Sequence, residues 1–198
     1  ASLIIAAGHL AELLVDGFGV YRSLDLFSIL VLVLASSQAL MFTFMLILLF
    51  DSRYVTFANV MKHAVPSLVF ILLYVVSCCI EADVCVYSLA EWRACVVHNL
   101  PLAVRTLFGV TYTVQLFVYI RLFFRKKRHY ITHLKELTGE RISKLELRLT
   151  MRAFLYALSI GIGAWVLLVC PGPIPEFSFS FLIVVFYPAF AWLYTNYH

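Results

Sequence analysis

The chain has 198 residues, of which 63% are hydrophobic and 13% are charged, and its mean hydropathy is +0.95. Soluble domains are about 45–50% apolar and about 25% charged, and a soluble domain of this size has too little interior to bury so much apolar surface. The composition therefore predicts an integral membrane protein, in which the distribution of the net charge of +4 is more informative than its size. The chain begins at Ala1 without Met and ends soon after an apolar run, so we expect a fragment.

Apolar runs of the right length predict the membrane crossings. A helix needs about 20 apolar residues to cross a hydrocarbon core of about 30 Å. The segment 1–15 is apolar but short and contains His9 and Glu12, so we expect it to be part of a crossing. The other expected crossings, in chain order, are 26–50, 64–80, 99–124, 153–170 and 177–197. The predicted fold class is all-α: one polytopic membrane helix bundle over residues 1–198, with six crossings or partial crossings.

Lysine and arginine are unevenly distributed among the connections. The segment 121–152 contains ten of the fifteen, and the connection 51–63 adds Arg53 and Lys62. The connections on the opposite side contain only Arg22 and Arg93. Because cytoplasmic loops are enriched in Lys and Arg, this pattern predicts a multi-pass plasma-membrane protein in which the segment 121–152 and both chain ends are cytoplasmic.

The longest connection on the outer side, residues 81–98, contains no Gly or Pro and is a candidate for a partial lid over the bundle. Two of the five cysteines, Cys85 and Cys95, lie in it, where oxidising conditions permit a disulfide. One interpretation is that they form a loop-closing bridge. The other is that the cysteines are small apolar residues at the membrane boundary.

The inner connection 125–147 is the most basic part of the chain and is predicted to be a cytoplasmic loop. Its first residues, Arg125-Lys126-Lys127-Arg128, follow directly on an apolar run. They anchor a helix end and attract anionic lipid in one interpretation. The charged helix expected beyond Gly139 either binds a cytoplasmic partner or is a solvated extension without a partner.

Polar residues inside the expected crossings indicate where function is carried out. Ser36, Ser37 and Gln38 form a small polar group. In one interpretation, which we favour, Gln38 and Gln115 hydrogen-bond each other across two helices. In the other, either glutamine contacts a ligand. Arg105 is expected about 9 Å below the outer end of its helix, at 1.5 Å per residue. It either extends outward to the interface or faces a cavity and attracts an anionic group of a ligand.

Catalytic motifs are absent from the sequence, so no enzyme activity is expected. There is no H-E-x-x-H or G-x-S-x-G motif and no Cys/His cluster with zinc spacing. His129 and His133 are four residues apart, but without a third ligand they are interpreted as surface histidines. We expect no metal, no cofactor and no nucleic-acid partner.

The expected crossings, taken with their motifs, resemble a known family. The longest apolar run ends in Asp51-Ser52-Arg53-Tyr54 and is followed by a short basic connection and a helix with an early Pro66. Trp165 lies in the outer half of the next-to-last crossing, and Tyr187-Pro188 lies in the last. In order, spacing and orientation the chain resembles the seven-helix G-protein-coupled receptors, and among them the nematode serpentine chemoreceptors, which have similar Phe- and Tyr-rich helices. The first helix, part of the second and the C-terminal tail would then be absent.

The resemblance implies a two-state receptor that binds a small external molecule and opens a cleft for a heterotrimeric G protein, with the lipid bilayer as its other partner. Arg53 would be restrained in the resting state by Asp51 or by Glu146. The ligand-binding residues implied are Ser36, Ser37, Gln38, Arg105 and Trp165. The residues implied in switching and G-protein coupling are Asp51, Arg53, Tyr54, Lys126, Lys127, Glu146, Tyr187 and Pro188.

Two other classes of protein remain as alternatives. A non-enzymatic accessory subunit of a membrane complex needs no ligand site, and aromatic-rich helices suit burial among partner helices. A small transporter or membrane enzyme needs an intramembrane charge relay or metal motif, and the sequence provides none.

Overall fold

The computed structural model describes residues 25–138 and 144–195, apart from the side chains of residues 134–138, 144–149, 173, 193 and 194. Its helices, in chain order, are α2 (Ile29–Leu48), α3 (Phe57–Ile80), α4 (Leu89–Cys95), α5 (Leu100–Thr138), α6 (Lys144–Val169) and α7 (Pro173–Thr195). Five of these helices are long and apolar enough to cross a membrane, and the described part of the chain contains no strand. The predicted fold class, a polytopic helical bundle, is confirmed. The partial crossing expected at 1–15 lies outside the described residues.

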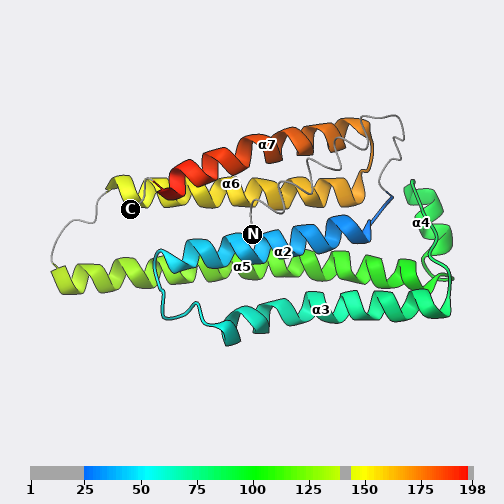
Figure 1. Ribbon diagram of the computed structural model, residues 1–198, viewed down its shortest axis with the longest axis horizontal. Helices are drawn as coiled ribbons and strands as arrows, with labels where there is room; N and C mark the ends of the chain where they lie inside the picture. The colour runs from blue at the N-terminus through cyan, green and yellow to red at the C-terminus, as the bar shows by residue number, and fades with distance from the viewer. Residues whose placement is uncertain (1–24, 139–143, 196–198) are drawn as a thin grey trace.

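The long helices run alternately up and down the bundle (Figure 1). Helix α2 is central, because α3, α5 and α6 all pack against it, and α7 packs mainly against α6. The connection 49–56 lies at one end of the bundle, next to the projecting part of α5, and we call this the basic end. The short helix α4 lies at the other end, which we call the Arg105 end after its buried arginine.

Several helices extend further than the apolar runs indicated. Helix α5 continues to Thr138, so residues 125–138 of the predicted loop 125–147 are helical, and α6 already begins at Lys144. Helix α3 begins at Phe57 instead of residue 64. Hydropathy marks where lipid contact ends, whereas a helix continues through charged residues such as Lys and Arg, which have good helix propensity.

Helix α4 lies inside the predicted connection 81–98 and was missed. The Ser88 side chain accepts a hydrogen bond from the backbone N–H of Glu91 at 3.2 Å, and the Glu91 carboxylate accepts one from the backbone N–H of Tyr87 at 2.9 Å. This is the Ser-x-x-Glu spacing of a helix N-terminus. The spacing is visible in the sequence and is the signal that could have identified the helix.

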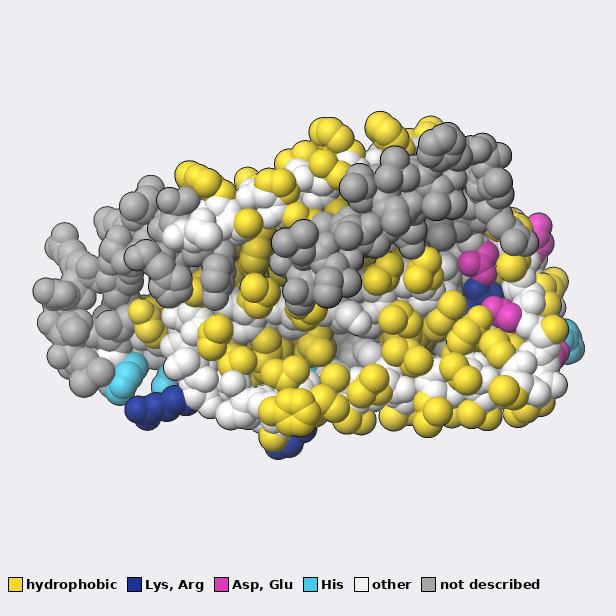
Figure 2. All heavy atoms as spheres, viewed as in Figure 1, with side chains coloured by type: hydrophobic (Ala, Val, Ile, Leu, Met, Phe, Trp, Pro, Cys, Tyr) yellow, Lys and Arg dark blue, Asp and Glu magenta, His cyan; other side chains and the backbone are white. Residues whose placement is uncertain are grey.

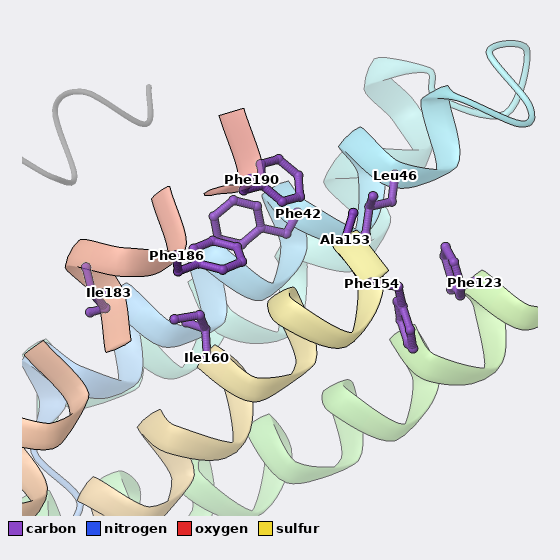
Figure 3. Close-up of a cluster of buried hydrophobic side chains, with 9 residues drawn as sticks. All are labelled: Phe42, Leu46, Phe123, Ala153, Phe154, Ile160, Ile183, Phe186 and Phe190. Atoms are coloured by element: carbon purple, nitrogen blue, oxygen red, sulfur yellow. The ribbon is translucent and has the colours of Figure 1, made fainter. Parts of the chain in front are cut away.

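An aromatic cluster forms the core of the bundle toward the basic end (Figure 3). The rings of Phe123 on α5 and Phe154 on α6 are stacked with centroids 4.0 Å apart. Phe42 of α2 makes edge contacts with Phe186 and Phe190 of α7, at centroid distances of 4.9 and 5.0 Å. In lipid, helices associate through close packing and not through the exclusion of water. Each aromatic pair contributes about 0.5–1.5 kcal/mol beyond its buried area, so this cluster is a principal source of helix association.

A close approach at the Arg105 end depends on a glycine. Phe27, just before α2, has a left-handed backbone with φ 54° and donates its backbone N–H to the carbonyl oxygen of Leu168 at 3.0 Å. Its ring lies against Gly109 of α5, where a Cβ atom would be 2.7 Å from the ring. The missing side chain of Gly109 is therefore what allows the segment before α2 to lie on α5.

The outer surface of the bundle is apolar along its length, as lipid contact requires. Figure 2 shows hydrophobic side chains covering the flank, with acidic side chains gathered at one end of the visible face. Helix α3 is the most exposed of the crossing helices, because only 6% of the residues in its most apolar stretch are buried. The exposed apolar residues of α3 include Leu68, Val69, Leu72, Leu73, Val75 and Val76.

Candidate functional site

Two polar clusters lie at opposite ends of the bundle, and the first is centred on Arg105. The side chain of Arg105 is only 2% exposed, although it carries a full positive charge. Its guanidinium forms ion pairs with Asp25, just before α2, and with Asp83, between α3 and α4, the latter at 3.1 Å. It also donates to the backbone carbonyl of Val84 at 2.9 Å. A buried charge is tolerated only when it is paired in this way.

The same cluster attaches the segment 81–96 to the end of the bundle. Asp83 accepts a hydrogen bond from the hydroxyl of Tyr74 at 2.8 Å, and the buried Val86 accepts one from the backbone N–H of Leu26 at 2.8 Å. The indole N–H of Trp92 on α4 donates to Thr106 of α5 at 3.0 Å. The segment therefore forms a lid that is fixed to α3, to α5 and to the residues just before α2, and we call residues 81–96 the lid.

The environment of Arg105 differs from both interpretations of the sequence. The guanidinium neither extends to the interface nor faces a cavity with its charge free, because two carboxylates already accompany it. Asp25 and Asp83 were not identified as its partners from the sequence. Both are polar residues at the ends of apolar runs, and such residues ordinarily contact water, so nothing in the local sequence distinguishes them.

No cavity lined by described residues alone brings the five predicted ligand-binding residues together. Ser36 is buried and donates to the carbonyl of Val33 at 3.2 Å, whereas Ser37 is exposed. Trp165 is 41% exposed, and its indole N–H donates to Thr113 of α5 at 3.1 Å. These contacts are structural, and they connect neighbouring turns or helices.

The predicted hydrogen bond between Gln38 and Gln115 is wrong. The amide of Gln38 donates to the hydroxyl of Tyr187 on α7 at 3.2 Å. Gln115 instead bonds the hydroxyl of Ser67 on α3 at 3.2 Å and the carbonyl of His63 at 3.4 Å. The two glutamines face different neighbours, since one contacts α7 and the other contacts α3.

Two small adjoining cavities lie between α2, α5 and α6. The larger admits the centres of water molecules over about 30 Å³ and the smaller over about 10 Å³. Both are lined by Ala39, Phe42 and Ala157, and the smaller one also by Gln38. One water needs about 10–15 Å³ by this measure, so the larger cavity has room for about two or three water molecules and the smaller for at most one. Of the five predicted ligand-binding residues, only Gln38 lines either cavity.

The second polar cluster lies at the basic end and joins the end of α2 to α5. The ammonium of Lys126 donates to the carboxylate of Asp51 at 2.9 Å and lies 3.7 Å from the centre of the Tyr54 ring. The backbone N–H of Tyr54 donates to the same carboxylate at 3.1 Å. The hydrogen bond from Lys126 holds the pKa of Asp51 below its ordinary value. Arg53 is exposed, and no ion pair joins it to another described residue. The partner of Asp51 is therefore Lys126 and not Arg53.

Aromatic contacts continue from this cluster into the bundle. The ring of Tyr54 stacks on Phe44 of α2 at a centroid distance of 6.1 Å, and Phe44 meets the imidazole of His63 on α3 at 5.4 Å. His63 in turn lies 5.7 Å from the ring of Tyr119 on α5. Three helices, α2, α3 and α5, thus meet beside the segment Asp51–Tyr54. The segment is fixed by its contacts with Lys126 of α5 and Phe44 of α2.

The other residues implied in switching lie elsewhere on α5, α6 and α7. Lys127 is half-buried and its ammonium lies 3.5 Å from the sulfur of Met151 on α6. Tyr187 accepts the bond from Gln38, and Pro188 follows it inside α7. The side chain of Glu146 lies outside the described residues, so a restraint of Arg53 by Glu146 stays a prediction.

The cysteines and histidines form no further site within the described part of the chain. Cys85 is exposed and Cys95 half-buried, and both are free thiols in the structure, so the bridge between them stays a prediction. The rings of His129 and His133 lie 6.3 Å apart on the exposed surface of α5. No group of three or more metal-ligating side chains occurs among the described residues.

Comparisons with known protein families, with characterised proteins and with solved structures give no match to this chain. The fold and the two polar clusters are therefore the observations on which a function is proposed.

Proposed function

We propose that this chain is the helical core of a chemosensory G-protein-coupled receptor of the plasma membrane, which binds a small external ligand and signals to a cytoplasmic heterotrimeric G protein. The observation that carries the proposal is the cluster at the basic end. The segment Asp51–Tyr54 follows the central helix of the bundle, Lys126 of α5 engages both its acid and its tyrosine, and Arg53 remains exposed. An exposed arginine beside a fixed acid–tyrosine pair is a suitable contact for the α-subunit of a G protein.

The switch in this proposal is a movement of the basic end of α6. Helices α5 and α6 pack against each other over a short stretch, whereas both pack extensively on α2. The described contacts between them at this end include the Phe123–Phe154 stack, the edge contact of Phe124 with Phe154 and the approach of Lys127 to Met151. Few contacts between α5 and α6 have to be exchanged when the two helices separate, and a bound G protein would favour the separated state.

The ligand in this proposal binds between the lid and the middle of the bundle. Arg105 then serves to fix the lid through Asp25 and Asp83, and Gln38 supplies a polar group beside the smaller cavity. Those cavities are too small for an organic ligand as they stand, so ligand binding would enlarge them and separate α6 from α2. This couples the ligand to the same movement of α6 that admits the G protein.

The test is guanine-nucleotide exchange on purified G proteins by the protein expressed from its complete gene and reconstituted in lipid nanodiscs. The protein without ligand is expected to increase basal exchange on at least one G-protein class. Asp51→Asn releases Lys126 and is expected to raise this basal exchange further, whereas Arg53→Gln is expected to lower it.

Lys62→Gln is the matched control, because Lys62 is another exposed basic residue near the same end and its loss removes the same charge. It is expected to leave exchange unchanged. If neither the unchanged protein nor the Asp51→Asn variant accelerates exchange on any G-protein class, the receptor function is contradicted, and an accessory subunit becomes the better interpretation. A glycosylation acceptor on a flexible linker tests the proposed orientation: it is expected to be modified in the lid and unmodified when inserted after Gly139.

A further inference from the structure

The basic residues of α5 are divided between two faces of the helix. Lys126 and Lys127 are partly buried and contact Asp51 and Met151, so they belong to the interior of the bundle. Arg121, Arg125 and Arg128 are exposed. Residues spaced by four and three positions lie on one side of a helix, so these three arginines form a single stripe, which we call the arginine stripe.

The arginine stripe continues the lipid-facing surface of α5. One and two turns closer to the middle of the bundle, the same side carries Val114, Phe117 and Val118, which are 56%, 68% and 44% exposed. At about 100° per residue, positions 114, 121, 125 and 128 fall within about 60° of one another. The face that meets hydrocarbon chains thus changes from apolar residues to arginine along its length, without turning toward another described helix.

The position of this change matches the boundary of the membrane. Helix α2 shows where the hydrocarbon core begins and ends, because its twenty residues from Ile29 to Leu48 span about 30 Å, which equals the thickness of that core. Asp51 lies three residues beyond α2 and contacts Lys126, so the end of the hydrocarbon core lies close to this level of α5. The arginine stripe extends from about 7 Å before that level to about 3 Å beyond it, at 1.5 Å per residue. Arginine side chains reach along the helix toward the headgroups, so all three guanidinium groups can lie in the headgroup layer.

We propose that the arginine stripe is a binding surface for the phosphate groups of anionic lipids in the leaflet at the basic end. A guanidinium forms two parallel hydrogen bonds with a phosphate, which suits arginine to this position. The surface is independent of the receptor function, since it needs only the membrane and this helix face. It assigns the arginines to lipid and leaves the adjacent lysines to the contacts between α2, α5 and α6.

The experiment measures the preference of the full chain for phosphatidylserine over phosphatidylcholine by native mass spectrometry of lipids retained from mixed micelles. Each basic residue near an anionic surface contributes about a fivefold change in association, so changing all three arginines to glutamine is expected to reduce the preference by roughly a hundredfold. Single variants are expected to lose about fivefold each. The triple change to lysine keeps the charge and is expected to retain most of the preference.

Arg93→Gln is the control, because Arg93 is exposed on α4 at the opposite end. It is expected to leave the lipid preference unchanged. Retention of the full preference by the triple glutamine variant overturns the proposal, as does an equal loss in the Arg93→Gln variant. If the triple variant fails to fold in phosphatidylcholine nanodiscs, the three single variants decide, and an unchanged preference in all of them overturns the proposal.

Discussion

Replacing Arg105 with methionine should destabilise the bundle more than any other single loss of charge in the described part of the chain. The substitution keeps most of the side-chain volume but leaves Asp25 and Asp83 facing each other without their cation. Removing one partner from a buried ion pair costs about 3–5 kcal/mol. The two aspartate side chains are 16% and 22% exposed, so water reaches them in part, and we expect the lower end of that range, about 3 kcal/mol.

Thermal unfolding in lipid nanodiscs measures this loss. About 3 kcal/mol corresponds to a decrease in Tm of roughly 6–12 °C for a chain of this size. Tryptophan fluorescence is a suitable signal, because Trp92 donates to Thr106 and reports release of the lid. Combining Arg105→Met with Asp25→Asn and Asp83→Asn removes the uncompensated charges and should recover most of the stability. A decrease below about 2 °C for Arg105→Met alone, or no recovery in the combined variant, would refute the assignment of Arg105 as the charge that fixes the lid.

Three further changes probe the packing and the basic end. Phe154→Ala removes the ring stacked on Phe123 and should cost about 3–5 kcal/mol in the free energy of unfolding, measured by chemical denaturation; a cost below about 1 kcal/mol would contradict its place in the core. The pKa of Asp51 is lowered in the folded protein, so the hydrogen bond from Lys126 stabilises the fold fully at pH values above the ordinary carboxylate pKa. This stabilisation is lost as the pH falls through the lowered pKa. Asp51→Asn should therefore reduce the acid-induced fall in Tm, and an unchanged dependence of Tm on pH would contradict this. Gly109→Ala places a methyl group 2.7 Å from the ring of Phe27 and should lower Tm by an amount that corresponds to about 1–3 kcal/mol, whereas an unchanged Tm would show that the ring moves freely.

The sequence predicted the helical bundle and the alternation of its crossings because both follow from properties of single residues. The length of an apolar run against the thickness of a membrane decides where a crossing lies, and Leu, Val, Ile, Ala and Phe together make up most of every such run. The ends of the helices were less predictable. Helix α5 continues through Arg125 and Lys127 to Thr138 because intrinsic helix propensity and not hydropathy governs that part of the chain.

The contacts of the polar side chains could not be predicted in the same way. Gln38 and Gln115 are suitable partners by chemistry, yet each bonds a residue on a different helix. Their choice depends on the rotation of α2 and α5 about their own axes. That rotation is set by packing among all the helices, to which each residue contributes a small part. The partners of Arg105 could not be predicted either, because Asp25 and Asp83 lie 80 and 22 residues away along the chain.

The positive charges at the two ends of the bundle are compensated in different ways, and this difference explains why the sequences of the two ends are so unlike. At the Arg105 end a single buried cation is surrounded by two carboxylates, so its charge is compensated inside the protein and serves to fix the lid. At the basic end Asp51 is the only acid among the described side chains, and its described ion pair is with Lys126. The exposed arginines of α5 must therefore be compensated from outside the described part of the chain, and the headgroups at that depth carry the phosphate charges that can do so. The basic residues of α5 are one continuous run in the sequence, yet they have two roles. The lysines on one face of the helix contact other parts of the bundle, and the arginines on the other face meet the lipid.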